Sequence, residues 1–137
     1  MAHHNQLDSP QGRRLLAAVR AACAALPNVV EQIDGFGHTT FRVGKKSFVI
    51  AGMGEDGTSI SIKADRANQA LLVSRGPYYR TPYIGQHGWV SVDAPLDQNW
   101  DEIRGLIEDA YRLAAPKRVA GLREPQLPDG RPPNEMM

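Results

Sequence analysis

The feature that most constrains the fold is a run of alternating residues on either side of a short turn. From Thr39 to Val43 polar and apolar residues alternate, which is the period-two pattern of a half-buried β-strand. Gly44-Lys45-Lys46 is a compact turn signal, and Ser47 to Met53 predicts the returning strand. A second turn leads to a third strand at Thr58–Ala64. We therefore expect a fold built around a β-hairpin at about His38 to Ala64.

The alternation also assigns each strand residue to one of two faces of the expected sheet. The inner, core-forming face is predicted to carry Phe41, Val43, Phe48, Ile50, Ile60, Ile62, Val90 and Val92. The outer face is predicted to carry Thr40, Arg42, Val49, Ala51, Ser59, Ser61, Lys63, Trp89 and Ser91. This outer set is mostly small, with one aromatic and two cations, which is a composition suited to binding a ligand. It also fits an ordinary solvated sheet face, with Trp89 packed beneath the loop at 78–87.

Helical patterns flank the strands. Ser9 followed by Pro10 is a helix start, and apolar residues recur at helical spacing as far as Leu26. Three further elements are expected: a helix from Asp65 to about Ser74 with Ala67, Ala70 and Leu71 on its apolar side, a strand from Gly88 to Asp93, and a last helix capped by Asn99 and Glu102 and ended by Pro116. The fold class is therefore α+β, with an antiparallel sheet that carries the N- and C-terminal helices on one face.

The chain of 137 residues is the size of one ordinary domain, and its hydrophobic fraction of 42% is enough to form a core. We expect a flexible N-terminus at 1–9, a single domain at 10–122, and a proline-rich disordered tail at 123–137. No apolar stretch approaches the roughly 20 residues that a membrane helix needs. The N-terminus also lacks the apolar core of a signal peptide. A monomeric cytoplasmic protein without a membrane partner is expected.

Few residues suggest catalysis or metal binding. Cys23 is the only cysteine, and it lies on an apolar helix face, so a buried hydrophobic role is expected. His38 is a candidate ligand or base, although a lone histidine is more often structural. An enzyme would need an unrecognised site around His38, Lys63 and Tyr83, and no activated nucleophile or acid–base pair is visible. We therefore expect no catalytic residues, no metal and no cofactor.

Basic residues gather locally, although the formal net charge is only +1. Arg42, Lys45 and Lys46 lie on the first hairpin, and Lys117 follows the last helix. Such groups are able to contact phosphates, with an affinity that falls as salt rises. A solvated charge cluster is the more common explanation of such a pattern.

The chain resembles the MmcQ/YjbR family of small bacterial proteins from about Leu15 to Leu122. The resemblance is carried by the order and spacing of His38-Thr39-Thr40-Phe41-Arg42-Val43 with Lys45-Lys46-Ser47-Phe48, Ser61-Ile62-Lys63-Ala64, Pro82-Tyr83-Ile84-Gly85 with Gly88-Trp89-Val90, and Tyr111-Arg112-Leu113-Ala114-Ala115-Pro116-Lys117-Arg118. It implies a CyaY-like fold, similar to that of bacterial frataxin, and a DNA-binding role for Arg42, Lys45, Lys46 and Lys63. Iron binding by an acidic first helix is not expected, because the helix after Pro10 carries arginines and no acid as far as Leu26.

Two hypotheses follow, and both describe a non-catalytic binding module. The first is a DNA-binding protein that uses the basic hairpin and the open sheet face. The alternative is a domain that binds another protein or a small ligand on the sheet face around Trp89 and Lys63. The candidate binding residues are Arg42, Lys45, Lys46, Lys63, Trp89, His38, Tyr83 and Lys117.

Overall fold

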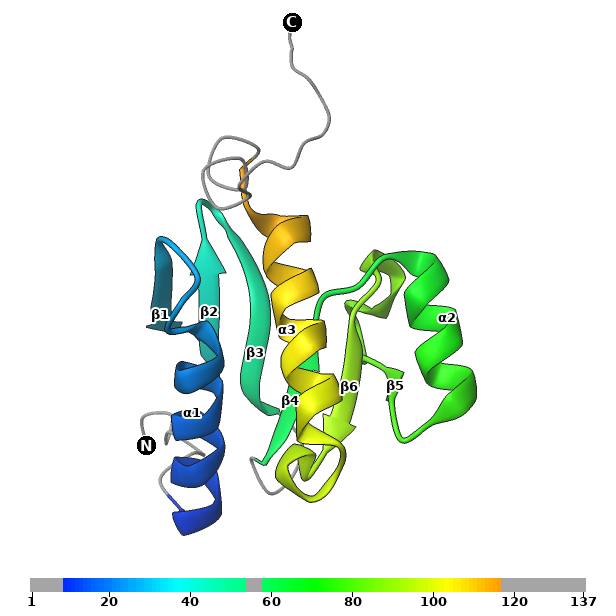
Figure 1. Cartoon of the computed structure of the whole chain (residues 1–137), viewed down its shortest axis with the longest axis horizontal. Helices are drawn as coiled ribbons and strands as arrows, with labels where there is room; N and C mark the ends of the chain where they lie inside the picture. Colours follow the sequence, from blue (N-terminus) through cyan, green and yellow to red (C-terminus); the bar gives the residue numbers. More distant parts are fainter. Residues whose placement is uncertain (1–8, 54–57, 117–137) are drawn as a thin grey trace, which may run out of the picture.

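The predicted hairpin is the centre of a six-stranded antiparallel sheet, in the order β1-β2-β3-β4-β6-β5 (Figure 1). The computed structural model describes residues 9–53 and 58–116. The strands are β1 (Val29–Ile33), β2 (Thr39–Val43), β3 (Lys46–Met53), β4 (Ser59–Ile62), β5 (Tyr79–Arg80) and β6 (Val90–Asp93). The helices are α1 (Pro10–Cys23), α2 (Arg66–Arg75) and α3 (Trp100–Ala114), with short 3₁₀ turns η2 (Gly85–His87) and η3 (Pro95–Asp97). The predicted α+β class is confirmed.

The core lies between the sheet and the terminal helices α1 and α3, which pack side by side on one face (Figure 1). The Phe48 ring meets the edge of the Tyr111 ring, with centroids 5.6 Å apart. The Tyr111 hydroxyl donates a hydrogen bond to the Pro27 carbonyl at 2.8 Å, so the polar end of this buried side chain is satisfied. The shorter α2 packs beside β5 and β6 at one side of the sheet.

The predicted helix caps are confirmed. The Ser9 hydroxyl accepts a hydrogen bond from the Gly12 amide, and the Asp65 carboxylate accepts one from Asn68. The Asn99 side chain accepts one from the Glu102 amide. Each cap satisfies a backbone donor that the first turn of a helix leaves without a partner. The first helix ends at Cys23 and not at Leu26, because the residues between Cys23 and β1 form non-helical turns.

The predicted faces of β3 are wrong beyond Phe48. Val49 and Ala51 are completely buried, whereas Ile50 is only partly buried. The cause is a β-bulge: Phe41 pairs with Val49 but the next residue, Arg42, pairs with Ser47. The extra residue on β3 moves the side chains of Val49, Ile50 and Ala51 to the other face, since a shift of one residue reverses the pleat. The predicted faces of β4 and β6 are correct, because Ile60 pairs with Val92 on the core side.

Two other expectations need correction, and some fall on residues that the structure does not describe. β1 and β5 were not predicted, because β1 is exposed along most of its length and β5 has two residues. The buried residues of α2 are Gln69 and Leu72, and not the predicted Ala67, Ala70 and Leu71. The predicted turn at 54–57, the terminus at 1–8, and everything from 117, including the predicted tail, lie outside the described residues. Within the described parts, the helices are too short or too polar to cross a membrane.

Candidate nucleic-acid interface

The strand register joins several predicted site residues in one row across the outer face of the sheet. Arg42 pairs with Ser47, and Lys63 continues the β3–β4 ladder through the hydrogen bond from its amide to the Phe48 carbonyl. Ile62 pairs with Val90 in antiparallel strands, so Lys63, which follows Ile62, lies beside Trp89, which precedes Val90. The row lies at the end of the sheet that holds the β2–β3 turn, at the top of Figure 1.

The β2–β3 turn presents two exposed lysines. Gly44 has φ +61°, which suits the first central residue of a two-residue hairpin loop of type II′. Lys45 is the second loop residue and Lys46 is the first residue of β3, and both are exposed. The Arg42 guanidinium donates a hydrogen bond to the Lys45 carbonyl at 2.8 Å. Arg42 therefore braces the turn that carries the lysines.

Lys63 and Trp89 share the outer face, as predicted. The Lys63 ammonium lies 5.9 Å from the centroid of the Trp89 ring and donates to the His87 carbonyl at 3.2 Å. Trp89 is only 7% exposed. Its ring is thus a support for Lys63 and not an open plane for a ligand.

The small residues of the outer face do not form the ligand-binding surface that their composition suggested. The Ser91 hydroxyl lies 2.7 Å from the Ser61 hydroxyl and 2.8 Å from the Thr81 hydroxyl, and all three residues are buried. These hydroxyls satisfy one another across β4, β6 and the residue after β5. They are therefore occupied within the protein.

The loop from Thr81 to Trp89, called here the β5–β6 loop, lies at the same end and is held at three successive carbonyls. The buried Gln69 amide donates to the Gly85 carbonyl at 2.7 Å and to the Trp89 carbonyl at 2.9 Å. Arg66 donates to the Gln86 carbonyl at 2.9 Å, and Lys63 to the next carbonyl. Sequence reasoning missed Gln69, because a polar residue within an apolar helical pattern is normally read as solvent-facing.

Tyr83 lies in this loop and is 93% exposed, with φ +69°. Arg80, which is also exposed, lies against Gly85: a Cβ atom on that glycine would come within van der Waals overlap of the Arg80 side chain. The loop therefore carries an aromatic ring into solvent, and Arg80 packs against the same loop at Gly85.

Six cations thus lie at one end of the sheet, which we call the basic end: Arg42, Lys45, Lys46, Lys63, Arg66 and Arg80. None of them forms an ion pair with a carboxylate of the described residues. Three of them are instead oriented by backbone carbonyls, as described above. The carboxylate of Asp65 lies nearby but caps α2. The basic end therefore keeps its positive charge available for an anionic partner.

His38 directly precedes β2, in the turn at the end of the sheet opposite the basic end. Asp34 accepts hydrogen bonds from the Phe36 and His38 amides, and its second oxygen lies 3.5 Å from His38 Nδ1. The Phe36 ring stacks on the imidazole at 6.2 Å. His38 is a structural part of this turn, about 13 Å along the strand from the row of Arg42. The hypothetical catalytic grouping of His38, Lys63 and Tyr83 is not assembled, and Lys117 lies outside the described residues.

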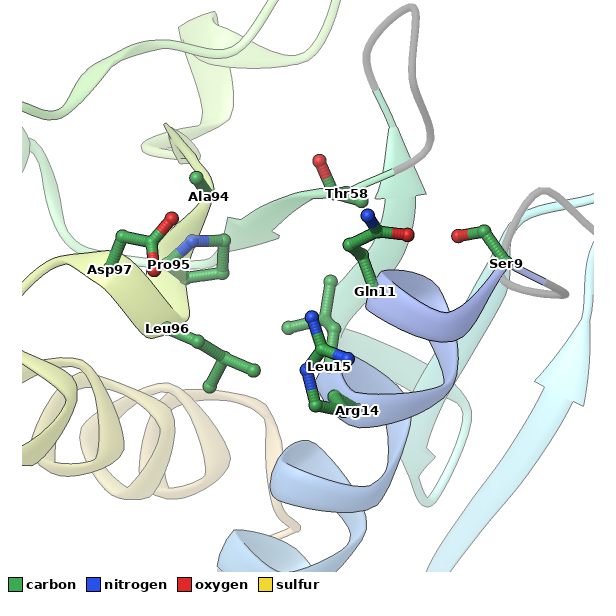
Figure 2. Close-up of a pocket in the computed structure, with 9 residues that line it drawn as sticks. All are labelled: Ser9, Gln11, Arg14, Leu15, Thr58, Ala94, Pro95, Leu96 and Asp97. Carbon is green, nitrogen blue, oxygen red and sulfur yellow. The ribbon is translucent and has the colours of Figure 1, made fainter.

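A cavity of about 420 Å³ lies at this opposite end, between the start of α1 and the turn after β6 (Figure 2). It is lined by Ser9, Gln11, Arg14, Leu15, Thr58, Ala94, Pro95, Leu96 and Asp97. In Figure 2, Gln11 and Arg14 project from α1 into the space between Thr58 and η3. The lining combines one cation with one carboxylate, so it lacks the single sign of charge found at the basic end.

Cys23 has the buried setting that was predicted for it. Burial, with a smaller contribution from Glu31, raises the pKa of its thiol to about 12. Such a thiol is not a nucleophile at neutral pH. Within 9–53 and 58–116, no three histidine, cysteine or acidic side chains gather where they could hold a metal ion.

An antiparallel sheet with helices on one face and cations at one end defines a small α+β protein with a surface suited to anions. The model of the YjbR family matches residues 24–113, so the chain belongs to the YjbR family. Among solved structures, the chain is similar to the crystal structure of Deinococcus radiodurans protein DR2400, which contains a DUF419 domain. The TM-score is 0.65 at 20% identity, over 75% of this chain and 80% of that one. This likeness shows the fold. A comparison with curated proteins found no match.

Proposed function

We propose that this YjbR-family protein binds DNA through its basic end. The observation that carries the proposal is the set of six cations at one end of the sheet without an ion pair to a described carboxylate. Phosphate groups are the natural partners of such a surface, because each lysine or arginine that contacts a phosphate releases condensed counterions. The resemblance to the MmcQ/YjbR family implies the same role for Arg42, Lys45, Lys46 and Lys63.

The geometry gives the cations different tasks in this proposal. Lys45 and Lys46 are exposed at the β2–β3 turn. Arg42 and Lys63 are half-buried and are oriented by hydrogen bonds to carbonyls. The lysines at the tip would contact phosphates directly, and the half-buried cations would contribute to the local positive potential. The alternative ligand site around Trp89 is less well supported, because the ring is covered.

A salt-titrated binding assay with a matched control tests the proposal. The doubly substituted variant Lys45→Ala/Lys46→Ala is compared with Arg14→Ala/Arg104→Ala, which removes the same charge from the opposite end. Fluorescence anisotropy is measured with a labelled duplex and with its single strand, from low to physiological salt. Loss of the lysines is expected to weaken binding roughly tenfold at low salt and to reduce the slope of log K against log salt by about 2.

The control variant should bind like the unaltered protein. Equal loss of affinity in both variants would mean that net charge alone drives binding, and the basic end would not be the site. Absence of binding by the unaltered protein to either probe at low salt would overturn the proposal altogether.

A further inference from the structure

We infer that the β5–β6 loop is a base-stacking site built around Tyr83, and that the DNA bound at the basic end is single-stranded. This inference rests on the proposed DNA-binding function and adds the class of DNA to it. Its starting point is that Tyr83 is 93% exposed, the highest exposure among the large hydrophobic side chains of the described residues.

The backbone at Tyr83 holds an unusual conformation. Its φ of +69° lies in the left-handed region, which costs energy for a residue with a bulky side chain. The turn is closed by a hydrogen bond from the Ile84 amide to the Pro82 carbonyl at 2.8 Å. An exposed aromatic ring on a strained backbone does not stabilise the free protein, because its apolar area is not buried and its φ is unfavourable.

The loop that carries Tyr83 is rigidly attached. The side chains of Gln69, Arg66 and Lys63 hold the carbonyls of three consecutive residues from Gly85 to His87. Gly88 has φ +99° and lies so close to the Ala64 carbonyl that a Cβ atom would overlap it. Tyr83 is therefore presented from a fixed platform, which lowers the entropy cost of binding a flat ligand.

The chemistry around the ring matches a nucleotide. Lys63, Arg66 and Arg80 are the cations of the same loop platform, and no aspartate or glutamate occurs between Tyr78 and Val92. Phosphates would meet these cations while a base stacks on the tyrosine. Stacking of bases on aromatic side chains along a positive surface is the usual way in which proteins bind single strands.

The requirement for an unpaired base follows from the stacking itself. In a duplex both faces of each internal base are covered by neighbouring base pairs, so a protruding tyrosine has no base face to contact. The sheet also offers a path for a strand. Four strand-to-strand steps separate β2 from β5 in the sheet order, which is about 19 Å at the usual spacing. The two lysines of the β2–β3 turn and the β5–β6 loop are thus far enough apart to contact different nucleotides of one strand.

The test uses the full-length protein and fluorescence anisotropy with a labelled mixed-sequence single strand and the corresponding duplex. The variants are Tyr83→Ala, Tyr83→Phe, and Phe36→Ala. Phe36 is a matched control, because it is a 74% exposed aromatic at the opposite end of the sheet. The unaltered protein is expected to bind the single strand more tightly than the duplex. Tyr83→Ala should lose five- to tenfold in affinity for the single strand and keep its affinity for the duplex.

Tyr83→Phe and Phe36→Ala should both retain single-strand affinity, since the first keeps a stacking face and the second is remote. The melting temperature of each variant is measured to show that folding is unchanged. A duplex that binds as tightly as the single strand, or an unaffected Tyr83→Ala, would overturn this inference and leave DNA binding standing. Failure of the unaltered protein to bind either probe would instead reject DNA binding itself.

Discussion

The two ends of the sheet differ in how their charged side chains are satisfied. At the basic end, Arg42, Lys63 and Arg66 donate to backbone carbonyls. At the opposite end, Arg75 is instead paired with a carboxylate: Arg75 and the Tyr78 hydroxyl donate to different oxygens of Glu102, both at 2.8 Å. A carbonyl orients a cation without cancelling its charge, whereas a carboxylate cancels it. The net charge of only +1 therefore conceals a local separation of charge.

Each end also carries an exposed aromatic in a loop, and the loops are stabilised in different ways. The turn at the opposite end is closed locally by Asp34, which accepts from the amides of Phe36 and His38. The loop at the basic end is held by Lys63, which follows β4, and by side chains from α2. The first depends on its own sequence, and the second depends on tertiary packing. Substitutions at the two ends should therefore have unequal effects on stability.

The largest expected effect comes from paired glycine substitutions at the two ends. In Gly88→Ala, the new Cβ would overlap the Ala64 carbonyl and φ would stay at +99°, so a loss of roughly 3 kcal/mol or more is expected. In Gly35→Ala, nothing lies within 4 Å of the new Cβ and the change should stay within about 0.5 kcal/mol. Urea unfolding measures both. Similar losses in the two variants would show that the β5–β6 loop is not the more tightly packed one.

A smaller loss is expected when the buried amide that anchors the β5–β6 loop is removed. Gln69→Leu removes the two hydrogen bonds from the side chain to the Gly85 and Trp89 carbonyls, each of which keeps one backbone amide donor, so the loss should be about 1–2 kcal/mol. Asn68→Ala is the neighbouring control on the exposed side of α2, and it should cost about 0.5 kcal/mol. Hydrogen exchange of the loop amides should accelerate in the first variant only. An unaltered exchange rate in Gln69→Leu would mean that the loop does not depend on this contact.

The smallest effect concerns the carboxylate at the opposite end and depends on pH. Hydrogen bonding by Tyr78, with a further contribution from Arg75, lowers the pKa of Glu102 below its usual value despite the opposing effect of burial. The ionised form is thus favoured by folding, so its stabilisation is present above the unfolded pKa of about 4.3 and is lost as pH falls through the lower folded value. Glu102→Gln should cost about 0.5–1 kcal/mol at pH 7.

The difference between the unaltered protein and Glu102→Gln should shrink as unfolding is measured at successively lower pH, below about pH 4. DNA affinity should not change, because Glu102 does not lie at the basic end. A gap in stability that is constant with pH would show that the substitution acts through packing and not through charge.

Much of the fold was predictable from local patterns. The hairpin, three helix caps and the inner faces of β4 and β6 all follow from residues close together in the sequence. The error in β3 arose because a bulge is not marked by any residue type: Phe48 and Val49 both point into the core. Strand β1 was not predicted because its side chains are largely exposed, so its sequence does not show the alternation of a half-buried strand.

The candidate site was only partly predictable for a similar reason. Lys45 and Lys46 were identifiable at the tip of the turn, and the pairing of Lys63 with Trp89 followed from strand alternation. The covering of Trp89 and the anchoring role of Gln69 were not visible, because both depend on contacts between β6, α2 and the β5–β6 loop.

Local sequence patterns were enough to predict the α+β class, the hairpin and the caps, because strand alternation and helix capping act over a few neighbouring residues. Tertiary structure decided which side chains of β3 face the core, and it placed cations from β2, the β2–β3 turn, β3, the residue after β4, α2 and β5 at one end of the sheet. It also decided that Tyr83 remains exposed while Trp89 is covered. The physical reason is that register, burial and charge pairing depend on residues that are distant in the chain and that meet only when the sheet is assembled.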